Sequence, residues 1–237
     1  MEMNHRQKRI SLRFSNQGFT MLELLVAMVV ALLALGAIYS TFLNQHKSYV
    51  VQGETAAMHQ NIRAAMFYLQ REIRMAGCDP LGTAGAGITT ANATSIRFSE
   101  DVRGAAAGTD SDGDTNDPNE AITYTRSGNN LVRNDSNGAL GNQMVAQNID
   151  AIDFVYLDGA TPPNVLNPGG GNVPLASLNQ IRSVAVTIVA RTGRSTMAST
   201  NNNAYFNQQG FQILGPQMDN FSRRRLTAVI KCRNLGI

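Results

Sequence analysis

Residues 19–43 read FTMLELLVAMVVALLALGAIYSTFL, and this stretch decides the fold because it is almost wholly apolar. Within it, the fifteen residues 24–38 carry no polar side chain. An α-helix needs about 20 apolar residues to span a bilayer, so the stretch predicts a membrane-embedded helix. Its only acidic residue is Glu23. A carboxylate inside a membrane costs about 2.5–3.5 kcal/mol at the centre, which makes Glu23 a candidate functional residue.

The 18 residues before this stretch, MEMNHRQKRISLRFSNQG, are polar and carry four Lys or Arg against one acid. By the positive-inside rule, this basic flank keeps the amino terminus in the cytoplasm and places the bulk of the chain outside the cytoplasmic membrane. An ordinary secretory signal is the alternative, since Ala34, Gly36 and Ala37 offer small residues for cleavage. Glu23 argues against that alternative.

The overall composition narrows the classes of function. Of 237 residues, 43% are hydrophobic and 16% charged, and the net charge is +3. Removal of residues 1–18 leaves basic and acidic residues in equal number, so the basic character is that of the leader and predicts no nucleic-acid surface. No histidine follows His59, which excludes imidazole-based catalysis and most zinc sites from the long C-terminal part.

Helical periodicity continues beyond the apolar stretch but becomes one-sided. A stripe at steps of three and four residues consists of Met58, Ile62, Ala65, Leu69, Ile73 and Ala76. Gly77 and then Pro80 form a stop signal. The sequence predicts one helix over residues 19–76, with bends permitted at Gly36 and Gly53. Two helices separated near Gly53 are the alternative.

Residues 79–237 have the texture of an antiparallel β domain. Short alternating runs predict strands at 95–98, 122–125, 130–132, 149–157, 181–189 and 226–232, separated by Gly, Asn, Pro and Asp clusters. The predicted class is α+β, with a long N-terminal helix packed on an antiparallel sheet.

The segment Gly18-Phe19-Thr20-Met21-Leu22-Glu23 resembles the class III signal of type IV pilins and type II secretion pseudopilins. The resemblance implies that prepilin peptidase cuts after Gly18, that Phe19 becomes the N-methylated terminus, and that the apolar helix is retained for anchoring and filament packing. It also implies that Glu23 pairs with the terminal amine of a neighbouring subunit. An ammonium and a carboxylate tolerate an apolar bundle together but not singly, so this pairing would fix the axial register.

Weaker motifs resemble the PilW group of minor pilins: residues 71–78, 120–124 and 225–234. This resemblance implies a non-enzymatic subunit that helps to initiate or cap a type IV pilus, with roles in twitching motility and adhesion. Its partners would be the major pilin, other minor pilins, prepilin peptidase and the inner-membrane assembly platform, with no nucleic acid. The protein would cross the inner membrane once, with a periplasmic head, before entering the filament.

The division of the chain expected from this resemblance is a cleaved leader 1–18, a filament-core helix 19–43, an amphipathic continuation 44–78 and a β-rich head domain 79–237. Two alternatives remain open. One is a J-type minor pseudopilin of a secretion or competence system, which has the same architecture. The other is a membrane-anchored exported enzyme or binding protein.

One acidic cluster, residues 110–120, has the composition of a calcium loop. Its candidate oxygen ligands are Asp110, Asp112, Asp114, Asp117 and Glu120. The spacing resembles the loops of extracellular calcium modules but departs from an EF-hand, because Thr115 stands where that motif has glycine. A solvated turn is the alternative, since loops use the same residue types. No cofactor other than calcium is expected.

Two smaller features complete the pattern. Cys78 and Cys232 lie in the exported part, so the sequence predicts one disulfide between them, with two buried free thiols as the alternative. The run Arg223-Arg224-Arg225 predicts a solvated face at the entry to a strand.

Overall fold

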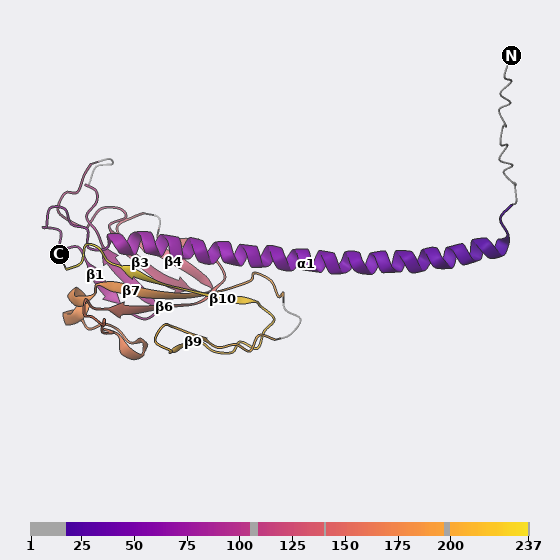
Figure 1. Cartoon of the computed structure of the whole chain (residues 1–237). Helices are drawn as coiled ribbons and strands as arrows, with labels where there is room; N and C mark the ends of the chain where they lie inside the picture. Colours follow the sequence, from indigo (N-terminus) through magenta and orange to yellow (C-terminus); the bar gives the residue numbers. More distant parts are fainter. Residues whose placement is uncertain (1–17, 105–108, 140, 197–199, 237) are drawn as a thin grey trace, which may run out of the picture. The chain divides into compact units, whose positions relative to one another are not determined.

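The computed structural model describes residues 18–104, 109–139, 141–196 and 200–236 (Figure 1). The predicted leader therefore lies outside the described residues, apart from Gly18. One helix, α1, runs without interruption from Met21 to Met75. The single-helix prediction is confirmed, and the alternative with a break at Gly53 is wrong.

The chain divides into two units within α1, between Tyr49 and Val50. In the first unit, every described residue from Gly18 to Tyr49 is exposed. Among the described residues, α1 is the one helix long and apolar enough to cross a membrane. The exposed surface is thus made of the leucine, valine and alanine side chains that the sequence places there.

The second unit, Val50–Ile237, is called the head unit here. Its part of α1 buries one face, and the predicted stripe is confirmed because all six of its residues are buried. Met66 is buried as well and was not predicted. The stripe packs into one core with residues of both larger sheets, such as Phe98 and Tyr124 from one and Phe154 and Tyr156 from the other.

In the described part of the head unit, the strands form three antiparallel sheets (Figure 1). The five-stranded sheet has the order β1-β2-β3-β4-β5, with strands Ile88–Ala91, Ser95–Ser99, Ala121–Ser127, Asn130–Asp135 and Asn142–Ala146. The three-stranded sheet has the order β10-β7-β6, with strands Arg223–Lys231, Ser183–Arg191 and Ile149–Leu157. A small ribbon pairs β8 (Tyr205–Phe206) with β9 (Gln212–Leu214), and two 3₁₀ turns, η1 (Pro168–Gly170) and η2 (Leu175–Gln180), lie between β6 and β7.

The α+β prediction is confirmed, and each of the six predicted strands corresponds to a strand of the structure. The strand Ile149–Leu157 has the predicted bounds, because seven of its nine residues are buried and its apolar run is long. The sequence did not predict β1, β5, β8 or β9. All four strands are short; the sequences of β1 and β5, ITTA and NQMVA, are also partly polar, and the ladder with a neighbouring strand defines them.

Gly77 ends the helix, as predicted. Its φ of +78° lies in the left-handed region, and the Cys78 N–H donates to the Met75 carbonyl at 2.9 Å. The Gly77 N–H donates to the Ser99 carbonyl at 2.9 Å, which ties the helix end to the end of β2. A Cβ at Gly77 would lie 2.4 Å from Leu235 Cδ2, the end of a flexible side chain, so the left-handed φ and not the available space favours glycine here.

Candidate functional site

Thr20, just before α1, and Glu23, in the first turn of α1, form a capping box at the start of the apolar helix. The Thr20 hydroxyl accepts from the Glu23 N–H at 3.3 Å, and Glu23 Oε2 in return accepts from the Thr20 N–H at 3.1 Å. The Thr20 hydroxyl also lies 3.0 Å from Glu23 Oε2. The two residues thereby satisfy N–H groups that have no partner within a helix.

Thr20 is a residue that the sequence analysis missed. The signal was present, since a threonine followed three residues later by glutamate before an apolar run is typical of a capping box. The structure thus assigns Glu23 a local role: it holds the first turn of the helix as well as carrying a charge. The side chain of Phe19, next to this box, is 87% exposed.

Glu23 is the only Asp, Glu, Lys or Arg between Arg13 and Lys47. It lies at one end of a shallow apolar surface on α1, lined also by Leu22, Val26, Ala27, Val30, Ala31 and Ala34. Small side chains on such a surface allow another helix to approach closely. A lone carboxylate on it requires a hydrogen-bonding or charged partner once lipid or protein covers the surface.

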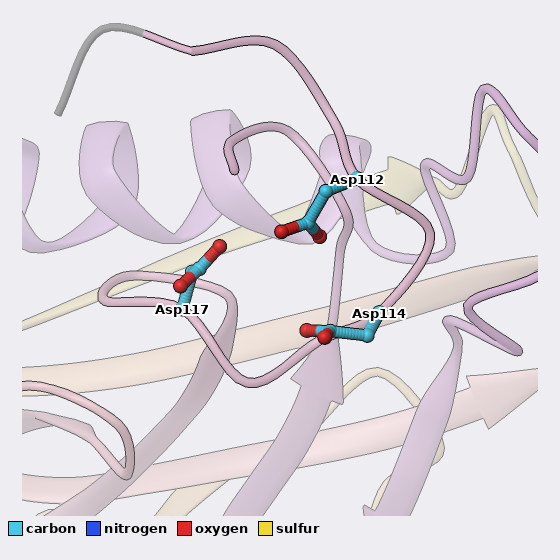
Figure 2. Close-up of side chains that lie close together, drawn as sticks. All are labelled: Asp112, Asp114 and Asp117. Atoms are coloured by element: carbon cyan, nitrogen blue, oxygen red, sulfur yellow. The ribbon is translucent and has the colours of Figure 1, made fainter. Parts of the chain in front are cut away.

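The predicted acidic loop connects β2 to β3, and the structure brings only part of the predicted ligand set together. The carboxylates of Asp112, Asp114 and Asp117 point toward one another, with one oxygen of each within 4.8 Å of the others (Figure 2). Asp110 is exposed and outside this group. Burial, followed by the charge of Asp112, raises the pKa of Asp117.

Glu120 also lies outside the group, because backbone donors occupy its carboxylate. Glu120 Oε1 accepts from the N–H groups of Val102 and Arg103 at 2.9 and 3.0 Å. Glu120 Oε2 accepts from the Asp117 N–H at 3.2 Å. Glu120 therefore organises the loop and is not placed as a ligand, contrary to the sequence prediction.

The structure contradicts the predicted disulfide, since Cys78 and Cys232 are both free. Cys78 follows α1, and its carbonyl accepts from the Asp101 N–H at 2.7 Å, next to the five-stranded sheet. Cys232 follows β10 and is buried in the core. Burial raises the pKa of the Cys232 thiol to about 12. The even cysteine count did not indicate that both thiols are free.

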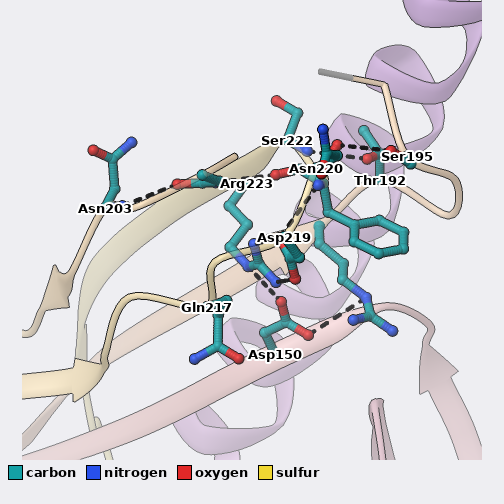
Figure 3. A network of polar contacts seen from close by, with 12 residues as sticks. Asp150, Thr192, Ser195, Asn203, Gln217, Asp219, Asn220, Ser222 and Arg223 are labelled. Atoms are coloured by element: carbon teal, nitrogen blue, oxygen red, sulfur yellow. Dashed lines mark hydrogen bonds and ion pairs between the residues drawn. The ribbon is translucent and has the colours of Figure 1, made fainter. Parts of the chain in front are cut away.

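Arg223 is the first residue of β10, which begins three residues earlier than predicted, and its side chain is buried, contrary to the predicted solvated face. Its guanidinium donates to both carboxylate oxygens of Asp219, at 2.5 and 2.6 Å, and to Asp150 Oδ2 at 2.6 Å (Figure 3). Arg191 approaches the other oxygen of Asp150 at 3.5 Å and stacks over the Phe221 ring. Arg223 is thus paired with carboxylates inside the head unit, whereas Arg224 and Arg225 are exposed.

Comparisons with known proteins match the N-terminal segment and the fold separately. The model of the prokaryotic N-terminal methylation motif matches residues 13–39, which include Gly18, Phe19 and Glu23. Among solved structures, a type IV-like pilin from Thermus thermophilus is similar to this chain, with a TM-score of 0.51 and 16% sequence identity. The match covers 75% of this chain and 98% of that pilin, and at this identity it speaks for the fold alone. Among curated proteins, none matches the chain significantly.

The motif and the fold are independent observations, because one comes from 27 residues at the amino terminus and the other from most of the chain. The chain thus combines the fold of a type IV-like pilin with a prokaryotic N-terminal methylation motif.

Proposed function

We propose that the chain is a minor pilin of the PilW type, a structural subunit that helps to initiate or cap a type IV pilus. In this account prepilin peptidase removes residues 1–18, the segment 19–43 first anchors the subunit in the inner membrane and later packs in the filament, and the head domain 79–237 is periplasmic. Its partners are the major pilin, sibling minor pilins and the assembly platform.

One observation carries the proposal. Glu23, the only charged side chain on the exposed apolar part of α1, lies in the first helical turn, where the Thr20 N–H donates to it at 3.1 Å. Cleavage after Gly18 would create an α-ammonium group on Phe19, the residue next to Thr20. Cleavage would therefore place a positive charge beside the one charged side chain on the apolar part of the helix.

In this account the Glu23 carboxylate changes its hydrogen-bond partner during assembly. In a single subunit, the Thr20 N–H and hydroxyl stabilise the carboxylate. In a bundle of apolar helices, the ammonium group of a neighbouring subunit offers a stronger, charged donor. Pairing of these two groups is satisfied at one axial offset between neighbouring helices, so it selects the register in which subunits pack.

The experiment uses chromosomal Glu23→Ala and Glu23→Gln variants in the strain that encodes the protein. Prepilin peptidase acts next to Gly18, so we expect both variants to be processed. Because an unpaired charge in an apolar bundle costs several kcal/mol, we expect their amount in sheared surface pili to fall at least about tenfold. Ser40→Ala is the matched control, since the Ser40 hydroxyl lies on the same helix and bonds only to the Ala37 carbonyl. Normal incorporation of Glu23→Ala would contradict the proposed role.

A gene deletion separates the pilus from the secretion machine. The proposal predicts loss of surface pili and twitching motility with protein secretion intact. Loss of secretion with normal piliation would instead assign the chain to a J-type pseudopilus.

A further inference from the structure

The loop between β2 and β3 places three carboxylates around one point. We propose that Asp112, Asp114 and Asp117 bind a calcium-type divalent cation. Their nearest oxygens lie within 4.8 Å of one another (Figure 2). Calcium–oxygen bonds are 2.3–2.6 Å long, so two ligands on opposite sides of the ion are about 5 Å apart. The spacing of the three carboxylates therefore fits one shared ion.

Asp117 supplies the observation that distinguishes this loop from an ordinary acidic turn. The residue is only 9% exposed, and its Oδ2 atom is buried without a hydrogen-bond partner among the described residues. Figure 2 shows this carboxylate directed toward that of Asp112. A buried carboxylate that faces other carboxylates is costly unless a cation or a donor compensates it. A cation held between the three side chains provides that compensation.

The backbone of the loop is fixed in the conformation that brings the three residues together. The Gly113 N–H donates to Asp101 Oδ2 at 3.1 Å, and the Asn116 N–H donates to Asp114 Oδ1 at 2.8 Å. Gly113 has a φ of +94°, and a Cβ there would lie 2.5 Å from the Thr83 hydroxyl oxygen, so this point of the loop requires glycine. The Asn137 side-chain amide donates to the carbonyls of Thr115 and Asp117 at 2.7 and 3.1 Å. The site is therefore largely organised before an ion binds.

The chemistry of the loop selects a hard cation. All three candidate ligands are carboxylates, which suit calcium, magnesium or manganese better than softer metals. The segment 100–120 carries seven acidic residues and one basic residue, Arg103. Asp112 and Asp114 are exposed, so water can complete a shell of six to eight oxygens. Calcium tolerates such an irregular shell, whereas magnesium requires a near-ideal octahedron.

Ion binding would reinforce contacts between separate parts of the head unit. The loop contacts the turn after α1 through the Thr83 hydroxyl, which donates to the Gly113 carbonyl at 3.3 Å. It contacts the end of β2 through Asp101 and the β4–β5 connection through Asn137. The bound ion would stabilise this end of the five-stranded sheet. This inference uses the head unit alone and does not depend on the proposed pilus function.

The test uses the full chain in detergent, stripped with EGTA and titrated with calcium or magnesium chloride. We expect calcium to bind with a Kd of about 0.1–1 mM, the range of extracellular calcium modules, and to raise Tm by several degrees. Asp114→Asn keeps the oxygen that accepts from Asn116, and Asp117→Asn removes only charge. Each variant should weaken calcium binding by at least about tenfold.

Two comparisons make the result specific. In EGTA, Asp117→Asn should melt no lower than the parent, because the amide removes carboxylate repulsion; this shows that the variant folds. Asp110→Asn makes the same charge change outside the group of three and should weaken binding by less than about threefold, since only a screened long-range charge is lost. A parent protein without a calcium response overturns the site. So does a response that Asp114→Asn and Asp117→Asn retain, or that Asp110→Asn abolishes. An equal response to magnesium overturns the assignment to calcium.

Discussion

Arg133 Nε of β4 donates to both carboxylate oxygens of Glu72 on α1, at 3.0 Å each. The Tyr124 hydroxyl of β3 donates to the same carboxylate at 2.7 Å. The side chains of Arg133 and Glu72 are 9% and 17% exposed. This ion pair, with one N–H shared between two oxygens, joins the C-terminal part of the helix to the five-stranded sheet through charge-assisted hydrogen bonds.

Loss of one partner of this pair should destabilise the head unit strongly. Because Arg133→Met leaves the Glu72 carboxylate without its charged donor, we expect the free energy of unfolding to fall by about 2–4 kcal/mol. Tyr124→Phe removes a single hydrogen bond and should cost about 1 kcal/mol. Urea unfolding of the full chain in detergent measures both. The double variant Glu72→Gln/Arg133→Met should lose less than the sum of the single changes; strict additivity would show that the two residues do not interact.

Glu100 predicts a pH dependence of stability. Burial, the largest cause, and the charges of Glu72 and Glu120 raise the pKa of Glu100 to about 7. The charges of Arg133 and Arg103 act in the opposite direction and offset part of this rise. Because the folded-state pKa lies above the unfolded value, the folded protein binds the proton more tightly. The contribution of protonated Glu100 to the free energy of unfolding is fully present below about pH 4.5 and is lost as pH rises through about 7.

Glu100→Gln should therefore raise the free energy of unfolding at pH 8 by at least about 1 kcal/mol and have little effect at pH 5. Urea unfolding of the parent and the variant at the two pH values measures the difference. An equal effect of the substitution at both pH values would contradict the assignment to Glu100.

The arginine run at the start of β10 offers a contrast between neighbours. The Arg223 side chain is 1% exposed and pairs with Asp150, which is 7% exposed, whereas Arg224 is exposed. Arg223→Met leaves two carboxylates without their main donor and should cost about 2–4 kcal/mol. Arg224→Met makes the same chemical change on the surface and should stay within about 0.5 kcal/mol. Similar losses for the two variants would mean that the network does not stabilise the head unit.

Thr20 is predicted to prepare Glu23 for assembly. Thr20→Val removes the hydroxyl from the capping box but keeps a side chain of similar size, and it should lower incorporation into sheared pili without preventing processing. The lost cap costs about 1 kcal/mol, so the expected decrease is roughly fivefold, smaller than for Glu23→Ala. Thr20→Ser retains the hydroxyl and should behave as the parent. A Thr20→Ser variant as defective as Thr20→Val would exclude the capping explanation.

Features that depend on local sequence were predicted well. Helical periodicity in the sequence predicts the buried stripe of α1. Gly77 followed by Pro80 predicts the end of the helix, and Gly77 adopts the left-handed conformation typical of such an end. Strands such as β6 and β7 were predicted because long apolar runs are typical of buried strands. The motif around Gly18 and Glu23 was legible because it is a contiguous pattern.

Features that depend on contacts between distant segments were not predictable. Glu120 fits a ligand pattern by spacing, yet the N–H groups of Val102 and Arg103 occupy it. Arg223 resembles a surface residue in the sequence, yet Asp150 and Asp219 surround it. The cysteine count suggested a bridge, whereas both thiols are free in the structure.

The most direct measurement of the central claim is the intact mass and N-terminal sequence of the protein extracted from membranes of cells that contain prepilin peptidase. The account predicts a mature chain that begins at Phe19 and carries one additional methyl group, and full-length chain when Gly18→Ala blocks the cut. Among the described residues, no atom lies within 4 Å of a Cβ added at Gly18, so we expect this variant to fold as the parent does. A mature chain that begins near residue 38, after the apolar stretch, would contradict the account.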